Sequence, residues 1–230
     1  MPVYHQMGHH SENLLAEQDL NAYAGAILSP VNNRPGDLNA QIHEMRQCHF
    51  SLDILFDPQL YVPKSKRGDL PKWSYVRSDT DTEDISSPTW WTKTTEMLAD
   101  ACEGLKGDVV GSPVPWSRQE YSISYYEFLI SLGNTLHSRL ANGKIRMVQT
   151  ALVRLADLVS KERVMEVASI LTRTKAKDLY LNFFTDVVPR REIPLGDEVR
   201  GGMQLIRVLQ EAGLRVLVGF VSTDIILWKS

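Results

Sequence analysis

Cysteine is nearly absent from this chain, which has two cysteines, Cys48 and Cys102, among its 230 residues. Two cysteines are too few for the disulfide framework of a small secreted protein, and they lack the C-x-x-C spacing of a zinc site. Long apolar runs are missing as well. None reaches the ~18–20 residues that a membrane span requires, and the first residues lack the charged-then-apolar order of a signal peptide. We therefore expect a reduced, cytoplasmic protein with no membrane association.

An excess of charge of one sign is also missing. Lys and Arg number 25 against 28 Asp and Glu, which gives a formal net charge of -3. Such a balance excludes the uniform basic field that drives sequence-independent binding to nucleic acids. Hydrophobic residues make up 43% of the chain and charged residues 23%. This composition excludes collagen-like, disordered and coiled-coil chains, and it is typical of a globular domain.

The sequence contains none of the short motifs that identify common cofactor or nucleophile sites. No predicted strand is followed by G-x-G-x-x-G or G-x-x-x-x-G-K-[ST], which disfavours a dinucleotide or nucleoside-triphosphate site. The absence of G-x-S-x-G disfavours an α/β-hydrolase. No H-x-H or H-E-x-x-H pair occurs. His9 and His10 are adjacent and His43 and His49 are six residues apart, whereas two ligands on one helix face need about i, i+3 or i+4 spacing. The sequence therefore predicts neither a cofactor nor a metal.

What the chain does contain is an alternation of apolar strands and amphipathic helices. Buried strands are predicted at residues 22–28, 50–56, 108–111, 145–150, 178–184 and 214–220. Helices are predicted at residues 12–20, 38–47, 89–105, 122–140, 161–173 and 199–212, by apolar residues at helical spacing together with capping residues at their ends. The strands are near-continuous apolar runs, which indicates a parallel sheet with helices on its outside.

Two α/β architectures fit this pattern. One is a TIM-barrel-like (β/α)8 barrel that is incomplete at about six βα units, and the other is an open doubly wound sheet. The missing nucleotide fingerprints favour the barrel. We expect residues 1–230 to form a single α/β domain with a long loop or lid at about 58–88, and the remaining barrel units to lie outside this chain.

Ligands of both architectures bind at the carboxyl ends of the strands, so the residues just past each strand are the candidate site. Asp57 and Asp186 each follow a strand directly, and paired carboxylates at a barrel mouth can act as acid, base or nucleophile. The alternative for Asp57 is a structural role, because Asp57-Pro58 is typical of a turn. The candidate substrate-binding residues are polar side chains at the same strand ends: Asn32, Gln59, Tyr61, Gln149, Asn182 and Arg190. Arg190 could bind a phosphate or carboxylate through paired donors.

The segment DILFDPQLY, residues 53–61, resembles the second-strand motif of the transglycosylases that exchange a base in tRNA. These enzymes are barrels in which an aspartate ends a strand in the sequence D-S-G-G-F-Q. Asp57 and Gln59 match that motif, whereas the family's paired glycines and its cysteine-rich zinc segment are absent here. The resemblance implies a barrel in which Asp57 recognises a base.

Cations and aromatic residues occur together between residues 58 and 91. Such surfaces can stack nucleic-acid bases, but the acidic residues of the same segment cancel its field, which favours a solvated lid. Trp90 and Trp91 are typical of a helix start that packs on a barrel. Two functions are therefore predicted. The first is a barrel-type transferase or hydrolase acting on a nucleobase, nucleotide or sugar, and the second is a non-catalytic barrel subunit that binds a partner protein through residues 58–91.

Overall fold

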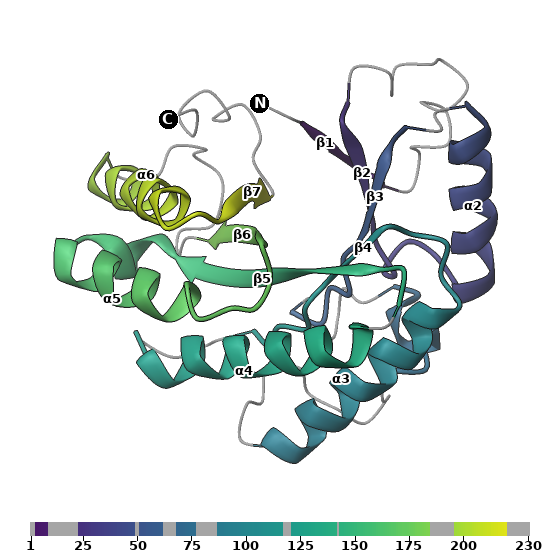
Figure 1. Cartoon of the computed structure of the whole chain (residues 1–230), viewed down its shortest axis with the longest axis horizontal. Coiled ribbons are helices and arrows are strands. Elements are labelled where there is room, and N and C mark those ends of the chain that lie inside the picture. Colours follow the sequence, from purple (N-terminus) through teal and green to yellow (C-terminus); the bar gives the residue numbers. More distant parts are fainter. Residues whose placement is uncertain are drawn as a thin grey trace. The chain divides into compact units, whose positions relative to one another are not determined.

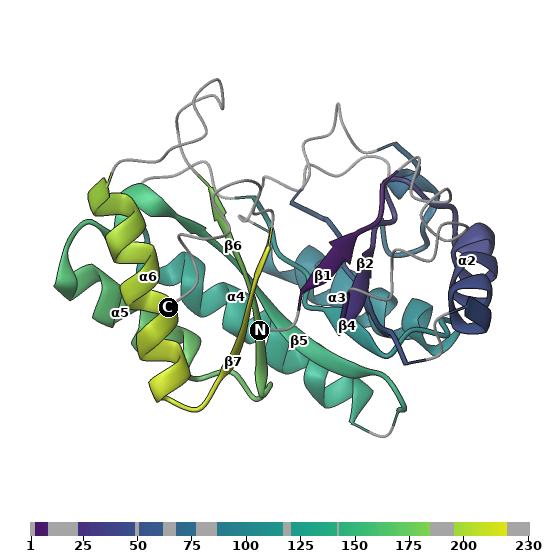
Figure 2. The same cartoon turned by 90° about the horizontal axis from the view of Figure 1, so that it is seen from above.

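The computed structural model describes residues 3–8, 23–48, 51–61, 68–76, 87–116, 121–141, 143–184 and 196–219. These residues fall into two compact units (Figures 1 and 2). The first unit contains residues 1–116 and 135–147, and the second contains residues 117–134 and 148–230.

The first unit is a parallel sheet whose strands follow one another in chain order. Its strands are β1 (Tyr4–Gln6), β2 (Gly25–Leu28), β3 (Asp53–Phe56) and β4 (Val109–Gly111). Helix α2 (Pro35–Cys48) connects β2 to β3, and α3 (Pro88–Glu103) precedes β4. Every residue of β2 and β4 is buried, as expected for strands that are covered on both faces.

The second unit repeats the same arrangement with longer strands. Strand β5 (Arg146–Arg154), whose first two residues belong to the first unit, pairs in parallel with β6 (Asp178–Phe184), and β6 pairs in parallel with β7 (Arg215–Gly219). The helical elements are α4 (Ile123–Leu140), whose residues from Thr135 on belong to the first unit, the 3-10 helix η4 (Leu155–Leu158), α5 (Lys161–Leu171) and α6 (Gly196–Glu211). Helix α6 contacts α5, η4 and β7.

The fold is therefore built from parallel β/α repeats of the TIM-barrel type. Strand order follows the chain in both units, whereas a doubly wound sheet reverses its order at a switch point. The structure describes seven strands, fewer than the eight of a closed barrel, so the barrel-like architecture is incomplete, as the sequence predicts. Strand β1 is the one that the sequence pattern misses, because its residues Tyr4, His5 and Gln6 do not form an apolar run.

Part of the predicted lid is packed into the core of the first unit. The segment 68–76 contains the short 3-10 helix η3 (Leu70–Lys72), and Leu70, Trp73 and Tyr75 are buried. The rings of Trp73 and Tyr75 lie 5.0 and 6.4 Å from the ring of Phe56, between ring centroids. Aromatic pairs at these distances stabilise a core beyond the area they bury. The buried side chains of this segment thus belong to the core, whereas Gly68, Pro71, Lys72 and Ser74 are exposed.

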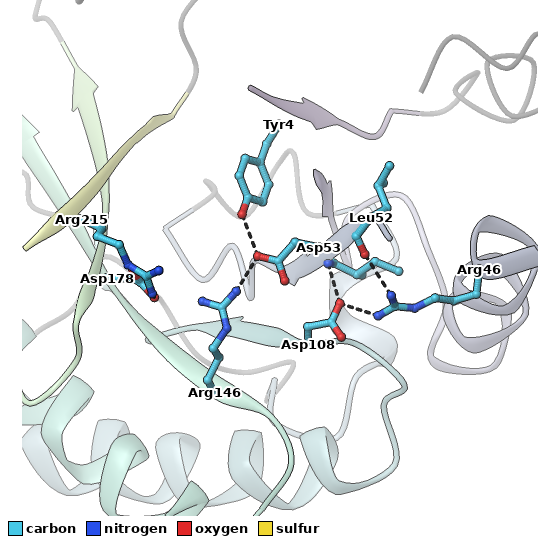
Figure 3. Close-up of polar contacts among 9 residues, drawn as sticks. Tyr4, Arg46, Leu52, Asp53, Asp108, Arg146, Asp178 and Arg215 are labelled. Carbon is cyan, nitrogen blue, oxygen red and sulfur yellow. Dashed lines mark hydrogen bonds and ion pairs between the residues drawn. The ribbon is translucent and has the colours of Figure 1, made fainter. Parts of the chain in front are cut away.

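Ion pairs and a tyrosine hydrogen bond connect the amino ends of the strands in the first unit (Figure 3). Asp53, the first residue of β3, accepts hydrogen bonds from Tyr4 Oη at 2.7 Å and Arg146 Nη2 at 2.5 Å. Arg46 of α2 pairs with Asp108, the residue before β4. These charges have partners in the fold, and partly exposed pairs of this kind contribute little free energy each, about 0–1 kcal/mol.

The second unit has the same feature at the same ends of its strands. Arg215 Nε lies 2.5 Å from Asp178 Oδ1, and these residues begin β7 and β6 (Figure 3). In barrels of this type, the amino-terminal face serves stability and the carboxyl-terminal face carries the chemistry. A functional site is therefore expected at the carboxyl ends of the strands.

Candidate active site

Asp57 lies at the carboxyl end of β3 and is held from two sides. Its backbone N–H donates to the carbonyl of Leu28 at 3.0 Å, which continues the ladder between β2 and β3. Its carboxylate accepts two hydrogen bonds, from Tyr61 Oη at 2.6 Å and from the backbone N–H of Gln59 at 3.1 Å. The Asp57 side chain is therefore fixed at the point where a barrel binds its ligands.

Burial raises the pKa of the Asp57 carboxyl group to about 6, because Asp57 is completely buried and its charged form loses hydration. The hydrogen bonds from Tyr61 and Gln59 act in the opposite direction and lower the pKa, since they stabilise the carboxylate. Desolvation is the larger effect. A carboxyl group that titrates near pH 6 can both accept and donate a proton at neutral pH, which is the property of a general acid or base.

Gln59 occupies a backbone conformation that is costly for its residue type. Its φ is 50°, and it is the one residue other than glycine with positive φ in the described part of the chain. The conformation aims the Gln59 side chain at Ser29, the residue after β2, whose hydroxyl donates to Gln59 Oε1. A backbone outlier of this kind costs about 1–3 kcal/mol, and such outliers cluster at functional sites.

The aromatic core lies directly beneath this group of residues. Tyr75 Oη donates to the carbonyl of Pro58 at 3.5 Å. The pKa of Tyr75 is raised well above its ordinary value, first by burial and then by the proximity of Cys102 and Asp57. Tyr75 therefore stays neutral, and the acidic proton in this group belongs to Asp57. Ser29, Asp57, Gln59 and Tyr61, which we call the Asp57 cluster, form the candidate active site.

The structure brings together four of the predicted site residues. Asp57, Gln59 and Tyr61 belong to the Asp57 cluster, and the backbone N–H of Asn32 donates to the carbonyl of Ser29 at 3.2 Å in the turn that follows β2. The turn interpretation of Asp57 also has structural support, because the bond from Gln59 N–H to the Asp57 carboxylate closes a local side-chain turn. Burial and the raised pKa are what distinguish Asp57 from an ordinary turn residue.

The other predicted residues lie elsewhere. Asn182 is buried in the second unit, near the end of β6. Gln149 is in the middle of β5, where its amide donates to the carbonyls of Leu129 in α4 and of Thr150, at 3.2 and 3.0 Å. This contact places Gln149 against a helix and away from a strand end. Asp186 and Arg190 lie outside the described residues.

The sequence misses Arg154, which is the true end of β5. Arg154 Nη2 and Nε lie 2.7 and 3.0 Å from Oδ1 of Asp157, a buried residue in η4. The sequence does indicate the longer strand, because residues 151–153 continue its apolar run past Thr150.

The aromatic residues of the predicted partner-binding segment are largely internal. Trp73, Tyr75 and Trp91 are buried, and the rings of Trp90 and Trp91 meet edge to face at 4.8 Å between centroids. A partner protein bound through residues 58–91 remains a prediction, and it would have to contact other side chains of that segment.

Neither a metal centre nor a membrane span is found in the described residues. No group of three or more His, Cys, Asp or Glu side chains in that part of the chain is placed to hold a metal ion. None of the helices in the same residues is long and apolar enough to cross a membrane.

Comparison with known proteins adds similarities to several solved structures at low identity. No family model matches the chain, and no curated protein matches it. A mandelate racemase/muconate lactonizing protein from Herpetosiphon aurantiacus is 9% identical, with a TM-score of 0.44, over 95% of this chain and 46% of that one. A GH26 β-mannanase from Bacteroides ovatus is 13% identical, with a TM-score of 0.45, over 84% and 60%. A 2,3-dimethylmalate lyase is 10% identical, with a TM-score of 0.43, over 94% and 75%.

The chain spans less than half of the first of these structures. Similarities at this level say nothing about substrate or reaction. The evidence for a function therefore comes from the geometry of the Asp57 cluster.

Proposed function

We propose that this chain carries the acid-base site of a barrel-type enzyme that acts on a polar ligand, a nucleobase, nucleotide or sugar, in a glycosyl-transfer or hydrolytic reaction. Asp57 is the acid-base group, and Ser29, Gln59 and Tyr61 position it. The observation that carries the proposal is the complete burial of the Asp57 carboxyl at a strand end, with its pKa raised to about 6.

Cleavage of a glycosidic bond needs a proton for the leaving group and a base for the attacking water or hydroxyl. A carboxyl group whose pKa is near 6 is suited to either task, whereas a carboxyl group with an ordinary pKa is almost never protonated at neutral pH. The resemblance of residues 53–61 to the tRNA-base transglycosylases supports the same class of ligand, because there it implies base recognition by Asp57. Asp186 as a second acid-base group and Arg190 as an anion clamp remain predictions.

The proposal is tested by replacing Asp57 with asparagine, which keeps the shape of the side chain and removes the proton. A panel of nucleosides, nucleotides and nitrophenyl glycosides provides the assay, with release of the base or of nitrophenol as readout. We expect Asp57→Asn to lower turnover of the accepted substrate at least about 100-fold, the lower range for loss of a general acid or base. The pH-rate profile of the parent protein should show a limb near pH 6 that the variant lacks.

Tyr61→Phe is a second test of the same carboxyl group. It removes the hydrogen bond to Asp57 Oδ2 that lowers the pKa of the carboxyl. The limb of the pH-rate profile should therefore move to higher pH. Unchanged turnover in Asp57→Asn, a limb that Tyr61→Phe does not move, or no turnover of any panel member by the parent protein would each refute the proposal.

A further inference from the structure

The second unit contains a buried amide with unused hydrogen-bonding groups. Asn182 on β6 is 2% exposed, and in the described structure neither its Oδ1 nor its Nδ2 has a hydrogen-bond partner. A buried polar group without a partner is unfavourable, and native proteins contain few of them. Gln149 on the neighbouring strand shows the usual situation, since its amide bonds to Leu129 and Thr150. The Asn182 carboxamide therefore requires an explanation other than packing.

The position of Asn182 in the sheet determines the face on which its amide lies. Asn182 is paired with Leu152 of β5 and Gly219 of β7 in the register of the sheet. Side chains alternate between faces along a strand, so Leu152 and Gln149, three residues apart, point to opposite faces. Because Gln149 bonds to α4, Asn182 lies on the face opposite α4. In a β/α barrel, that is the interior face.

Gly219 makes room for the carboxamide. A Cβ atom at position 219 would overlap Asn182 Oδ1 and would lie 2.5 Å from Tyr180 Cε2. The Asn182 amide and the Tyr180 ring therefore both lie over the bare backbone of the neighbouring strand. A glycine in a strand often marks a place where another group approaches the backbone closely, and Gly219 is the last residue of β7.

We infer that Asn182 recognises the edge of a nucleobase at the carboxyl end of β6. A carboxamide presents a donor and an acceptor side by side in one plane, and the edge of a base such as adenine offers the complementary pair. Such a ligand would satisfy both unused atoms at once. The inference concerns the second unit alone and goes beyond the proposed role of Asp57 in the first unit.

The neighbours of Asn182 favour a planar heterocycle over a sugar. On the same face, Leu152 and Tyr180 flank Asn182, and Leu217 of β7 is the partner of Tyr180 in the register. Thr150 of β5, the other register partner of Tyr180, adds a hydroxyl group to this face. The Tyr180 ring and the two leucines nevertheless make it mostly apolar, which suits an aromatic ring with a polar edge. A sugar, with hydroxyl groups on every side, would require several polar partners.

The test is equilibrium binding of adenosine, guanosine, cytidine and uridine, with ribose and methyl glucoside as the sugar probes, followed by saturation-transfer NMR and calorimetry. We expect saturable binding of at least one nucleoside and none of either sugar. Asn182→Leu keeps the volume and removes both polar atoms. It should weaken that binding at least about 10-fold, as expected for one bidentate contact to a base. The melting temperature of the variant should stay the same or rise by a few degrees, because the unused polar atoms are gone.

Two further variants make the result specific. Gly219→Ala should also weaken nucleoside binding, because the added methyl group displaces the Asn182 carboxamide. Gln204→Leu, a half-buried residue of α6, should leave binding unchanged. Failure of every nucleoside to bind the parent protein, binding of the sugars with equal strength, or full binding by Asn182→Leu would overturn the inference.

The readout also separates this inference from the proposed role of Asp57. Binding by the Asn182 and Gly219 variants and turnover by Asp57→Asn are separate measurements, because the Asn182 contact lies in the second unit and Asp57 in the first. A protein that binds nucleosides through Asn182 but shows no Asp57-dependent turnover would refute the proposed function and leave this inference standing.

Discussion

Replacing Asp57 with asparagine should make the first unit more stable at neutral pH. The pKa of the Asp57 carboxyl is 3.8 in a model compound and about 6 in the folded protein. A shift of this size corresponds to about 3 kcal/mol of unfolding free energy, which the parent protein loses when the buried carboxyl ionises. An asparagine has no proton to lose. Its amide can still accept from the Gln59 N–H and donate to Tyr61 Oη.

The stability difference between Asp57→Asn and the parent protein should depend on pH. Below about pH 3, the carboxyl is protonated in both the folded and the unfolded chain, so it causes no penalty. As the pH rises from about 3 to about 7, the unfolded chain ionises first, and the unfolding free energy of the parent protein falls. Above about pH 7 the penalty is complete. The advantage of Asp57→Asn should therefore be near zero at about pH 3 and reach about 3 kcal/mol at about pH 7.5.

Urea unfolding followed by tryptophan fluorescence measures this difference, because four of the five tryptophans belong to the first unit. Asp100→Asn, an exposed acid on α3, is the control, and it should change the unfolding free energy by less than about 0.5 kcal/mol. If Asp57→Asn instead lowers stability at pH 7.5, the carboxylate serves the turn at residues 57–59. A residue whose removal stabilises the fold is typical of a functional site, where activity and stability compete.

The second large effect is expected from Trp91→Ala. The Trp91 side chain is completely buried in α3 and is among the largest fully buried side chains of the described residues. Its removal leaves a cavity the size of an indole ring, and substitutions of this type cost about 3–5 kcal/mol. Urea unfolding followed by circular dichroism would measure the loss without depending on the deleted fluorophore.

Trp90→Ala is the matched control, because Trp90 is only half-buried and should cost clearly less. The comparison also tests the prediction that the chain is an interaction subunit. If Trp91 belonged to a surface that binds a partner protein, its replacement would leave stability unchanged and abolish co-purification of that partner. A loss of about 4 kcal/mol places it in the core instead.

Much of the fold can be predicted from the sequence, because buried parallel strands are apolar runs between helices with clear caps. Strand 178–184 and helix α5 illustrate this. The bounds of that strand agree with the prediction, and Ser160 caps α5 by accepting from the N–H of Arg163. Strand β1 is not predictable in this way, since its polar residues join the sheet only through pairing with β2. The predicted end of β5, at Thr150, is too early, because the strand continues to Arg154.

The candidate site is predictable only in part. The position of Asp57 at a strand end follows from the apolar run before it. The contact between Ser29 and Gln59 joins residues 30 positions apart, and the positive φ of Gln59 is uncommon for its residue type. The direction of Gln149 could not be known either, because alternation along a strand assigns faces only once the covering helix is known. The burial that raises the pKa of Asp57 is likewise a property of the assembled core.

The central claim is that Asp57 is a buried acid-base group, and direct titration of its carboxyl carbon tests this most directly. Carbon-13 NMR of the protein labelled in its aspartate carboxyl groups, compared with the spectrum of Asp57→Asn, would assign the resonance of Asp57. We expect this resonance to titrate near pH 6, well above the ordinary value for an aspartate carboxyl group. A midpoint near 3.8, the ordinary value, would contradict the account, because Asp57 would then be a permanently charged turn residue.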